Sequence, residues 1–342
     1  MSHTKGLLLL ASVALIVGCA RPVAPLAEVA QPSPTPAAPI SFPRDAGPHD
    51  GLSEWWYYTG HLTSAQGHAY GFEFVIFQVR RQDAPTGYLA HFAISDIDGN
   101  RFSHQMRFAQ SEAATGFPLD VGGWTLAAET LQAAMEPGPG ADPPFALNLR
   151  ITDVKPPALH NGGYIEYGLA GGSYYYSRTR LHVTGDLDGI AVSGIAWMDH
   201  QWGNFVVTAL GGWDWYSVQL DDNTELMLYV LRSATGETTG VYGTRVLSDG
   251  STQELGSGSV QAEPLGSWTS PHTGATYPSG WLLTLPDGLR LNLEPQLSDQ
   301  ELWFPQVSAA TGAGSMTYWE GAVKVSGDRT GLGYVELTGY AR

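Results

Sequence analysis

Apolar side chains recur at every second position through most of the chain that follows Phe42. Residues 70–77 and 88–94 both alternate in this way, and in residues 70–77 the positions between are largely apolar as well. A period of two is typical of a β-strand, and apolar residues on both faces indicate a strand that is buried on both sides. Only residues 126–135 have the length of a useful helix, and they also fit a strand. The pattern therefore predicts a body built of β-strands.

Short turns rich in Gly and Asp separate many of these strands. Asp188-Gly189 is a two-residue connection of the kind that favours a β-hairpin, and Pro286-Asp287-Gly288 is similar. The predicted strand pairs are residues 181–187 with 190–197, 282–285 with 289–293, and 323–325 with 334–337. Many short strands joined by such turns predict an all-β fold of the barrel or sandwich type.

A faint internal repeat indicates two similar β domains. Residues 55–62 and 213–220 are both rich in aromatic side chains, and each is followed by a polar turn and an apolar strand. Chance matching between aromatic-rich strands is the alternative explanation. We favour duplication, and we predict an N-terminal β domain at residues 44–200 and a C-terminal β domain at residues 201–342.

The first residues differ in composition from the body. Residues 1–18 combine Lys5 with an apolar run, which is typical of a signal peptide and is too short to span a bilayer. The sole cysteine, Cys19, ends this run in a sequence that resembles the bacterial lipobox, whose cysteine becomes lipidated. An ordinary signal peptide is the alternative. Residues 19–43 are rich in Pro and Ala and predict an extended tether. We therefore expect an exported protein that is lipid-anchored to the bacterial cell envelope.

The charge balance limits the partners. The 342 residues include 17 Lys and Arg against 33 Asp and Glu, which gives a formal net charge of −16. Such a chain repels phosphate backbones and shows no basic stripe, so nucleic-acid binding is excluded. The same charge disfavours electrostatic docking on anionic lipid, so any attachment to a membrane has to be covalent.

Sequence motifs for common cofactors and metals are missing. The chain has no G-x-G-x-x-G after a strand, no P-loop, no G-x-S-x-G and no H-E-x-x-H. No two histidines have the short spacing of a metal-binding pair, and one cysteine is too few for a cysteine-based zinc site. We therefore predict no cofactor and no metal, although a metal site assembled across the fold would leave no such signal.

Three segments combine aromatic side chains with an acidic residue or a histidine; they are Glu54–Tyr58, Trp197–Gly203 and Tyr318–Gly321. Because side chains alternate between the faces of a strand, Glu54, Trp56 and Tyr58 would share one face, and His200 would share a face with Trp202. Flat aromatic surfaces of this kind suit an apolar, unsaturated ligand.

Each segment also has a purely structural explanation. A buried aromatic stripe is most often part of a core. Glu54 would then pair with Arg80 or Arg178, Glu320 would form another internal ion pair, and His200 would be a hydrogen-bonded structural histidine. The functional interpretation rests on the density of the clusters, because burying titratable groups among aromatic side chains is costly.

The three segments in this order, together with Gly333–Tyr340, resemble the AttH family, which also contains the carotenoid 1,2-hydratases. The resemblance covers residues 42–342 and implies two lipocalin-like β-barrels. The activity it implies is the addition of water across a terminal carbon–carbon double bond of an acyclic carotenoid. Other members of the family resemble isomerases, cyclases or proteins of unknown activity.

The resemblance also implies particular site residues. The histidine and tryptophan of the family's H-x-W-G segment match His200 and Trp202, and an essential tyrosine matches Tyr229. The hydratases have an aspartate shortly after this tyrosine, whereas Val230 and Leu231 occupy those positions here. This departure implies that the protein either uses another acid or does not hydrate carotenoids.

We therefore predict a hydro-lyase-like or isomerase-like enzyme that acts on an apolar isoprenoid or similar unsaturated lipid. Protonating an alkene gives a carbocation, which requires a desolvated acid of raised pKa and an aromatic lining. The candidate acids are Asp199, Glu54 and Glu320, with His200 orienting the acid or activating water. The predicted ligand-binding residues are Trp55, Trp56, Tyr58, Trp197 and Trp319, and the cation would also be shielded by Trp202 and Tyr229. A carrier of an apolar ligand is the alternative, and the sequence specifies neither the ligand nor the oligomeric state.

Overall fold

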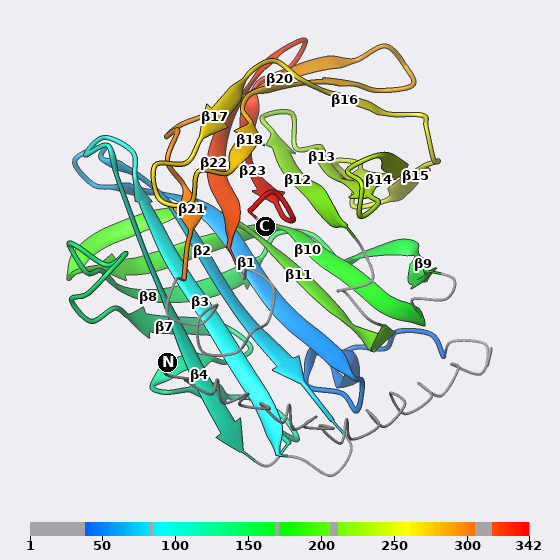
Figure 1. Cartoon of the computed structure of the whole chain (residues 1–342). Helices are drawn as coiled ribbons and strands as arrows, with labels where there is room; N and C mark the ends of the chain where they lie inside the picture. Colours follow the sequence, from blue (N-terminus) through cyan, green and yellow to red (C-terminus); the bar gives the residue numbers. More distant parts are fainter. Residues whose placement is uncertain are drawn as a thin grey trace, which may run out of the picture. The chain divides into compact units, whose positions relative to one another are not determined.

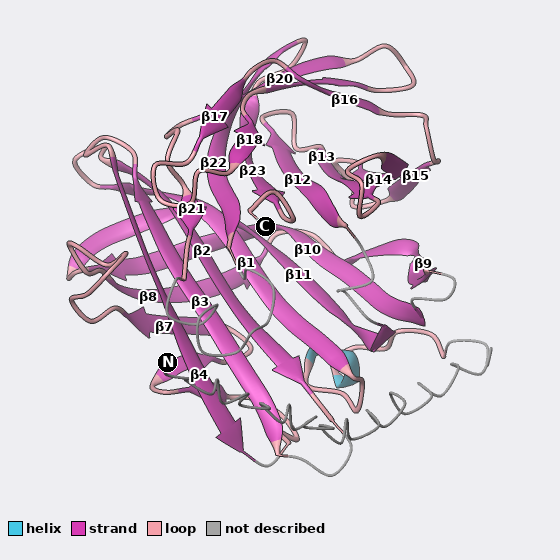
Figure 2. Cartoon of the chain, viewed as in Figure 1, coloured by secondary structure: helices cyan, strands magenta, loops and turns pink. Residues whose placement is uncertain are grey.

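The strands form two large antiparallel sheets and one small one in a computed structural model of the chain (Figure 1). The structure describes residues 38–81, 85–111, 113–167, 171–205, 211–304 and 317–341, all of which lie in one unit beginning at Pro34. Within these residues the only helix is the short 3-10 helix η1 (Arg44–Ala46), and everything else is strand or loop (Figure 2). None of the described helices is long and apolar enough to cross a membrane.

The first sheet has eleven strands from the N-terminal half of the chain. They are β1 (Ser53–Ser64), β2 (Ala69–Val79), β3 (Thr86–Asp96), β4 (Arg101–Ser111), β5 (Leu119–Val121), β6 (Trp124–Leu126), β7 (Thr130–Ala134), β8 (Ala146–Asp153), β9 (Ala158–Glu166), β10 (Gly171–Leu187) and β11 (Ile190–Phe205). Their order is β4-β3-β2-β1-β11-β10-β8-β7-β6-β5, and β9 pairs with β10 off this path. The sheet curves so that β5, at one end of the order, contacts β3 and β4 at the other.

The second sheet has ten strands from the C-terminal half. They are β12 (Gly212–Leu220), β13 (Glu225–Arg232), β14 (Thr238–Val246), β15 (Thr252–Leu255), β16 (Gln261–Pro264), β19 (Trp281–Thr284), β20 (Arg290–Pro295), β21 (Glu301–Leu302), β22 (Tyr318–Gly327) and β23 (Gly331–Leu337). Their order is β15-β14-β13-β12-β23-β22-β20-β19-β16, with β21 on β22 off this path. The small sheet pairs β17 (Ser267–Thr269) with β18 (Thr276–Pro278).

The two large sheets repeat one topology. In each, the first strand lies between the second strand and the last one: β1 between β2 and β11, and β12 between β13 and β23. The strand outside the main path pairs with the penultimate strand in both sheets, as β9 on β10 and β21 on β22. This confirms the predicted all-β fold with two barrel-like, lipocalin-like sheets.

Three apolar cores explain why some strands are buried on both faces. One core fills the first sheet around Trp56 and Phe74, and a second fills the second sheet around Trp281 and Leu291. A third core lies between the sheets and includes Tyr57. Phe74 and Val75 of β2 therefore enter different cores, as the apolar pattern on both faces of residues 70–77 predicted.

The structure settles one alternative that the sequence left open and moves one predicted boundary. Residues 126–135 form no helix but the end of β6 and the strand β7, because Leu131 and Ala133 are buried while Gln132 is exposed. The predicted boundary between residues 200 and 201 falls inside β11, which pairs with β1 and β10 as far as Phe205. The chain reaches the second sheet at Gly212.

The predicted tether also ends earlier than Pro43. Ile40 packs against the first core, and the ring of Phe42 contacts that of Tyr176 edge-on, with 4.9 Å between the centroids. These two apolar residues therefore belong to the folded body. Residues 1–37, with the predicted signal peptide and Cys19, lie outside the described residues.

Candidate functional site

Strand β11 divides the residues predicted to be functional between two places. His200 and Trp202 point into the first barrel-like sheet, where they contact each other and His200 also stacks on Trp56. Asp199 points to the other face, where Trp197 and Tyr175 of the inter-sheet core donate hydrogen bonds to it. The single site predicted from the sequence is therefore two separate clusters.

Inside the first sheet, Glu54 joins two histidines. Its Oε1 atom lies 2.8 Å from His200 Nε2 and 2.7 Å from His49 Nδ1, and its Oε2 atom accepts hydrogen bonds from Gln78 Nε2 and the His49 backbone N–H. Burial raises the pKa of Glu54, but the hydrogen bonds from His200 and His49 outweigh it and leave the pKa below its ordinary value. Glu54 is therefore a buried carboxylate held between two histidines.

Aromatic rings enclose this His49–Glu54–His200 cluster. Trp202 stacks on His49 with 4.1 Å between ring centroids, and Trp56 stacks on His200 at 4.8 Å. Burial lowers the pKa of His200, against the opposing effect of Glu54. The predicted ion pair of Glu54 with Arg80 or Arg178 does not form, because Arg80 pairs with Asp50 and Arg178 pairs with Asp153.

Between the two sheets lies a cluster of three glutamates. Glu73 of β2 and Glu320 of β22 are buried and Glu336 of β23 is half-buried, and among the described residues no Arg or Lys forms an ion pair with any of them. Burial and the neighbouring glutamate charges raise the pKa of Glu73 and Glu320 well above the ordinary value. Burial also raises the pKa of Glu336, to about 7. Like charges close together in a low-dielectric core disfavour ionisation, so Glu73 and Glu320 hold their protons at neutral pH, whereas Glu336 is partly protonated there.

Two of these carboxyls have an unused oxygen. Glu320 accepts a hydrogen bond from the Tyr57 hydroxyl on Oε1, while its Oε2 atom is buried without a partner. Glu73 accepts from the Tyr318 hydroxyl on Oε1 at 3.4 Å, and its Oε2 atom is likewise unpartnered. Most buried polar groups in proteins are hydrogen-bonded, so two bare carboxyl oxygens in one core are unusual and make this cluster a candidate site.

Aromatic side chains surround the glutamates. The ring of Tyr57 contacts Trp215 edge-on at 5.3 Å, and Trp215 in turn contacts Trp197 at 6.1 Å. Trp213 donates its Nε1 hydrogen to Glu336 over 3.1 Å. The cluster therefore combines neutral acids with an aromatic lining.

Asp199 lies beside this cluster with a different environment. Its carboxylate accepts hydrogen bonds from Tyr175, Ser177 and Trp197, the last at 2.6 Å. Burial nevertheless raises the pKa of Asp199 to about 6, and its charge contributes to the raised pKa of Glu320. Asp199 is therefore largely ionised at neutral pH while Glu320 is protonated.

A chain of hydrogen bonds connects Asp199 with the surface. Ser177 Oγ lies 2.6 Å from His160 Nε2, and His160 Nδ1 lies 2.8 Å from Thr244 Oγ1. Thr244 donates in turn to the exposed Glu254 over 3.2 Å. These contacts link the buried carboxylate of Asp199 to the exposed carboxylate of Glu254.

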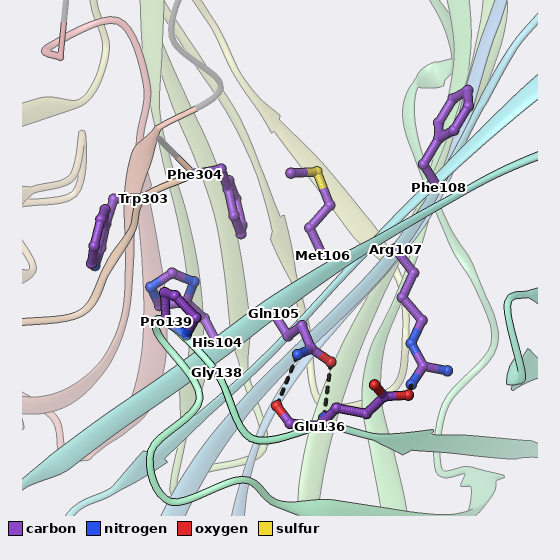
Figure 3. Close-up of a pocket in the computed structure, with 10 residues that line it drawn as sticks. All are labelled: His104, Gln105, Met106, Arg107, Phe108, Glu136, Gly138, Pro139, Trp303 and Phe304. Atoms are coloured by element: carbon purple, nitrogen blue, oxygen red, sulfur yellow. Dashed lines mark hydrogen bonds and ion pairs between the residues drawn. The ribbon is translucent and has the colours of Figure 1, made fainter. Parts of the chain in front are cut away.

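An open pocket of about 440 Å³ lies on the outer face of β4, next to the residues that follow β21 (Figure 3). Trp303, Phe304 and Met106 present apolar surface to it, with His104 alongside. Phe304 contacts His91 at 4.8 Å, and His91 Nδ1 lies 2.7 Å from the Tyr318 hydroxyl that bonds Glu73. Side chains in contact therefore lead from the pocket to the glutamate cluster.

The remaining predicted residues lie in several places. Tyr58 is buried in the first core, and Trp319 is buried in the second, next to Trp281. Trp55 and Tyr229 are half-buried at the margin of the inter-sheet core. The side chain of Trp319 thus points away from the glutamate cluster, because Glu320, the next residue, lies on the opposite face of β22.

Sequence reasoning did not identify several of the residues that complete these clusters. Glu73 carried a usable signal, since it is a charged residue inside the apolar strand at residues 70–77. Glu336 lies within the Gly333–Tyr340 segment but had no signal of its own. His49 carried no signal, because it lies in a loop and only folding brings it beside Glu54 and His200.

Comparisons with known proteins agree with this fold. A family model described as AttH-like matches residues 33–340. A crystal structure assigned to AttH, that of NE1406 from Nitrosomonas europaea, has 31% identity and a TM-score of 0.79, and the match covers 90% of this chain and 99% of that one. Kievitone hydratase from Nectria haematococca has 17% identity and a TM-score of 0.65 over 87% of this chain and 92% of its own, which is a likeness of fold. No match was found among curated proteins.

Proposed function

This chain belongs to the AttH-like family, and from that premise we propose that it is an enzyme that protonates a carbon–carbon double bond of an apolar, unsaturated ligand. The product is a hydrated or an isomerised ligand. The observation that carries the proposal is Glu320, a neutral acid in an aromatic core with one oxygen bound by Tyr57 and the other bare.

Glu320 is suited to be the proton donor. Its raised pKa keeps the proton on the carboxyl at neutral pH, because the carboxyl is buried beside other acids and no Arg or Lys among the described residues pairs with it. The proton goes to one alkene carbon, the π electrons form the new C–H bond, and the other carbon becomes a cation. The faces of Tyr57 and Trp215 stabilise that cation.

Asp199 is suited to be the matching base. With a pKa of about 6 it is mainly ionised where Glu320 is protonated, and pairs of carboxyls separated in this way take opposite roles in catalysis. In hydration, water bonds to the cation and its proton goes to Asp199. In isomerisation, the carbon next to the cation loses its proton to Asp199 and a new double bond forms. The proton on Asp199 then has to return to Glu320, whose carboxyl is electrostatically coupled to Asp199, so that both groups are restored for the next turnover.

A carrier function is the second candidate, and a specific observation favours it. Val230 stands near the position where the hydratases have an aspartate, and its side chain is part of the apolar core of the second sheet. A protein without an acid there would bind an apolar ligand without changing it. The same experiment decides between the two functions.

The test uses the purified full chain with an acyclic isoprenoid that has a terminal double bond, in D₂O, followed by mass spectrometry. We expect deuterium on carbon, with a gain of one water for hydration or an unchanged heavy-atom composition for isomerisation. Glu320→Gln keeps the shape of the side chain but not the acidic proton, so turnover should fall by at least about 100-fold. Glu263→Gln, an exposed glutamate of β16, is the matched control and should be fully active.

Two results would contradict the enzyme. Recovery of the isoprenoid without deuterium, although it binds, would show a carrier. Turnover by Glu320→Gln equal to that of Glu263→Gln would remove Glu320 as the acid.

A further inference from the structure

The His49–Glu54–His200 cluster brings together three side chains from distant parts of the chain. His49 comes from the loop before β1, Glu54 from β1 and His200 from β11, with Trp56 and His200 opposite each other in the strand register. One nitrogen of each histidine and one oxygen of Glu54 converge, and all three atoms lie within 4.8 Å of one another. Two imidazoles and one carboxylate are a donor set that recurs in protein metal sites.

The outward-facing atom of each of these side chains is held by another group. His49 Nε2 lies 3.3 Å from Asp45 Oδ1, and His200 Nδ1 lies 3.1 Å from the Tyr176 hydroxyl. Glu54 Oε2 is held by Gln78 at 3.1 Å. Metal-binding histidines in proteins almost always have such a partner on the other ring nitrogen, because it fixes the ring and leaves the inner nitrogen free to bind.

The surroundings favour a cation at the point of convergence. Glu54 and His200 are 1% and 0% exposed, and His49 is half-buried beneath the indole of Trp202. The buried negative charge of Glu54 has no Arg or Lys partner among the described residues. A divalent ion there would balance this charge and is reachable from the side of His49, which is partly open to solvent.

We propose that His49, Glu54 and His200 bind a divalent transition-metal ion of the Zn²⁺ class. The imidazole nitrogens favour such an ion over Mg²⁺ or Ca²⁺, which prefer oxygen ligands. On binding, the inner nitrogen of each histidine gives up its proton to solvent or to its own outer nitrogen, which for His200 then donates to the Tyr176 oxygen. This proposal makes His200 a metal ligand. It does not depend on the proposed function, because His200 lies on the opposite face of β11 from Asp199, and Glu320 belongs to the cluster between the sheets.

The bound ion would fasten the segment before β1 to the first sheet. His49 and Asp45 lie in that segment, whereas Glu54 and His200 lie on paired strands. An ion that binds only the folded chain stabilises it in proportion to the logarithm of its concentration over its dissociation constant. Metal binding should therefore raise the melting temperature.

The experiment is calorimetric titration of the chelator-treated full chain with ZnCl₂, together with thermal melting. We expect one tight Zn²⁺ per chain, a higher melting temperature with Zn²⁺, and no such effect with MgCl₂. Affinity should fall as the pH is lowered, because protons compete for the imidazole nitrogens. His49→Ala, which alters a half-buried loop residue, should abolish the tight site while the apo chain stays folded by circular dichroism. Asp45→Asn should weaken it about 10- to 100-fold.

His68→Ala is the matched control. His68 is also half-buried, also contacts a carboxylate, Asp96 at 2.6 Å, and also stacks on an aromatic ring, Tyr70 at 4.6 Å. It lies outside the cluster and should leave Zn²⁺ binding unchanged. The proposal is overturned if the wild-type chain binds no stoichiometric Zn²⁺, if folded His49→Ala retains the tight site, or if His68→Ala loses it equally.

Discussion

The pKa of Glu336 shows how strongly the inter-sheet core favours neutral carboxyls, and the pH dependence of stability can test it. Burial raises its pKa from 4.5 to about 7, against the hydrogen bond from Trp213. Between these two values the folded chain keeps the proton and the unfolded chain releases it, so the free energy of unfolding falls as the pH rises through this window. A shift of this size corresponds to about 3 kcal/mol. Glu336→Gln removes the titration and should gain stability relative to wild type between pH 5 and pH 8, measured by urea unfolding at each pH.

The buried histidines make the comparison with wild type necessary. Burial lowers the pKa of His61 to about 4 and that of His160 to about 3, and such groups add stability as the pH rises. They are present in both chains and cancel in the difference. A wild-type-minus-variant difference that stays constant with pH would show that Glu336 ionises normally in the folded chain.

At the level of residues, the sequence identified site residues that lie within one strand and missed partners that only folding brings beside them. Glu54, His200 and Glu320 were found because each lies among aromatic residues in its own strand. Their partners His49 and Glu73 come from other segments, and β pairing across the sheet or between sheets is not written in any short motif. For the same reason the sequence placed Asp199 and His200 in one site, although they are neighbours that face opposite sides of β11.

At the level of elements, Gly71 of β2 allows the two sheets to approach closely. A Cβ atom there would lie 2.9 Å from the Cβ of Ala322 on β22 and would also meet the Tyr334 hydroxyl. Gly71→Ala should therefore push β2 away from the second sheet and lower the free energy of unfolding by about 1–3 kcal/mol. Gly116→Ala, whose new Cβ would meet nothing within 4 Å, is the control and should change stability little. Equal denaturation midpoints for the two variants would contradict a tight contact at this place.

The elements themselves were largely predictable. The hairpins around Asp188-Gly189 and around residues 286–288 form as expected, because their turns and flanking apolar patterns agree. Residues 126–135 stayed ambiguous because a short apolar run fits both periods. The predicted domain boundary between residues 200 and 201 falls inside β11, because residues 201–205 continue to pair with the neighbouring strands β1 and β10.

At the level of the whole molecule, the duplicated topology was foreseeable only as a faint repeat between residues 55–62 and 213–220. Both segments became the first strand of a sheet, paired on one side with the last strand of that sheet. The inter-sheet glutamates come from both halves, Glu73 from the first and Glu320 and Glu336 from the second. The proposed catalytic site therefore needs both domains, and neither repeat contains it alone.

We further propose that this two-domain body is held at the cell envelope by a lipid on Cys19. A net charge of −16 disfavours binding to anionic lipid, Cys19 is the only cysteine, and it ends an apolar run too short to span a bilayer. The Pro- and Ala-rich residues that follow would hold the body off the membrane, and an anchored enzyme would meet apolar ligands where they dissolve. Wild type should take up radiolabelled fatty acid and sediment with membranes, whereas Cys19→Ser should be unlabelled and either released or left unprocessed. Ser33→Ala serves as the control and should behave as wild type. A Cys19→Ser chain that has lost its signal peptide yet still sediments with membranes would require a different anchor.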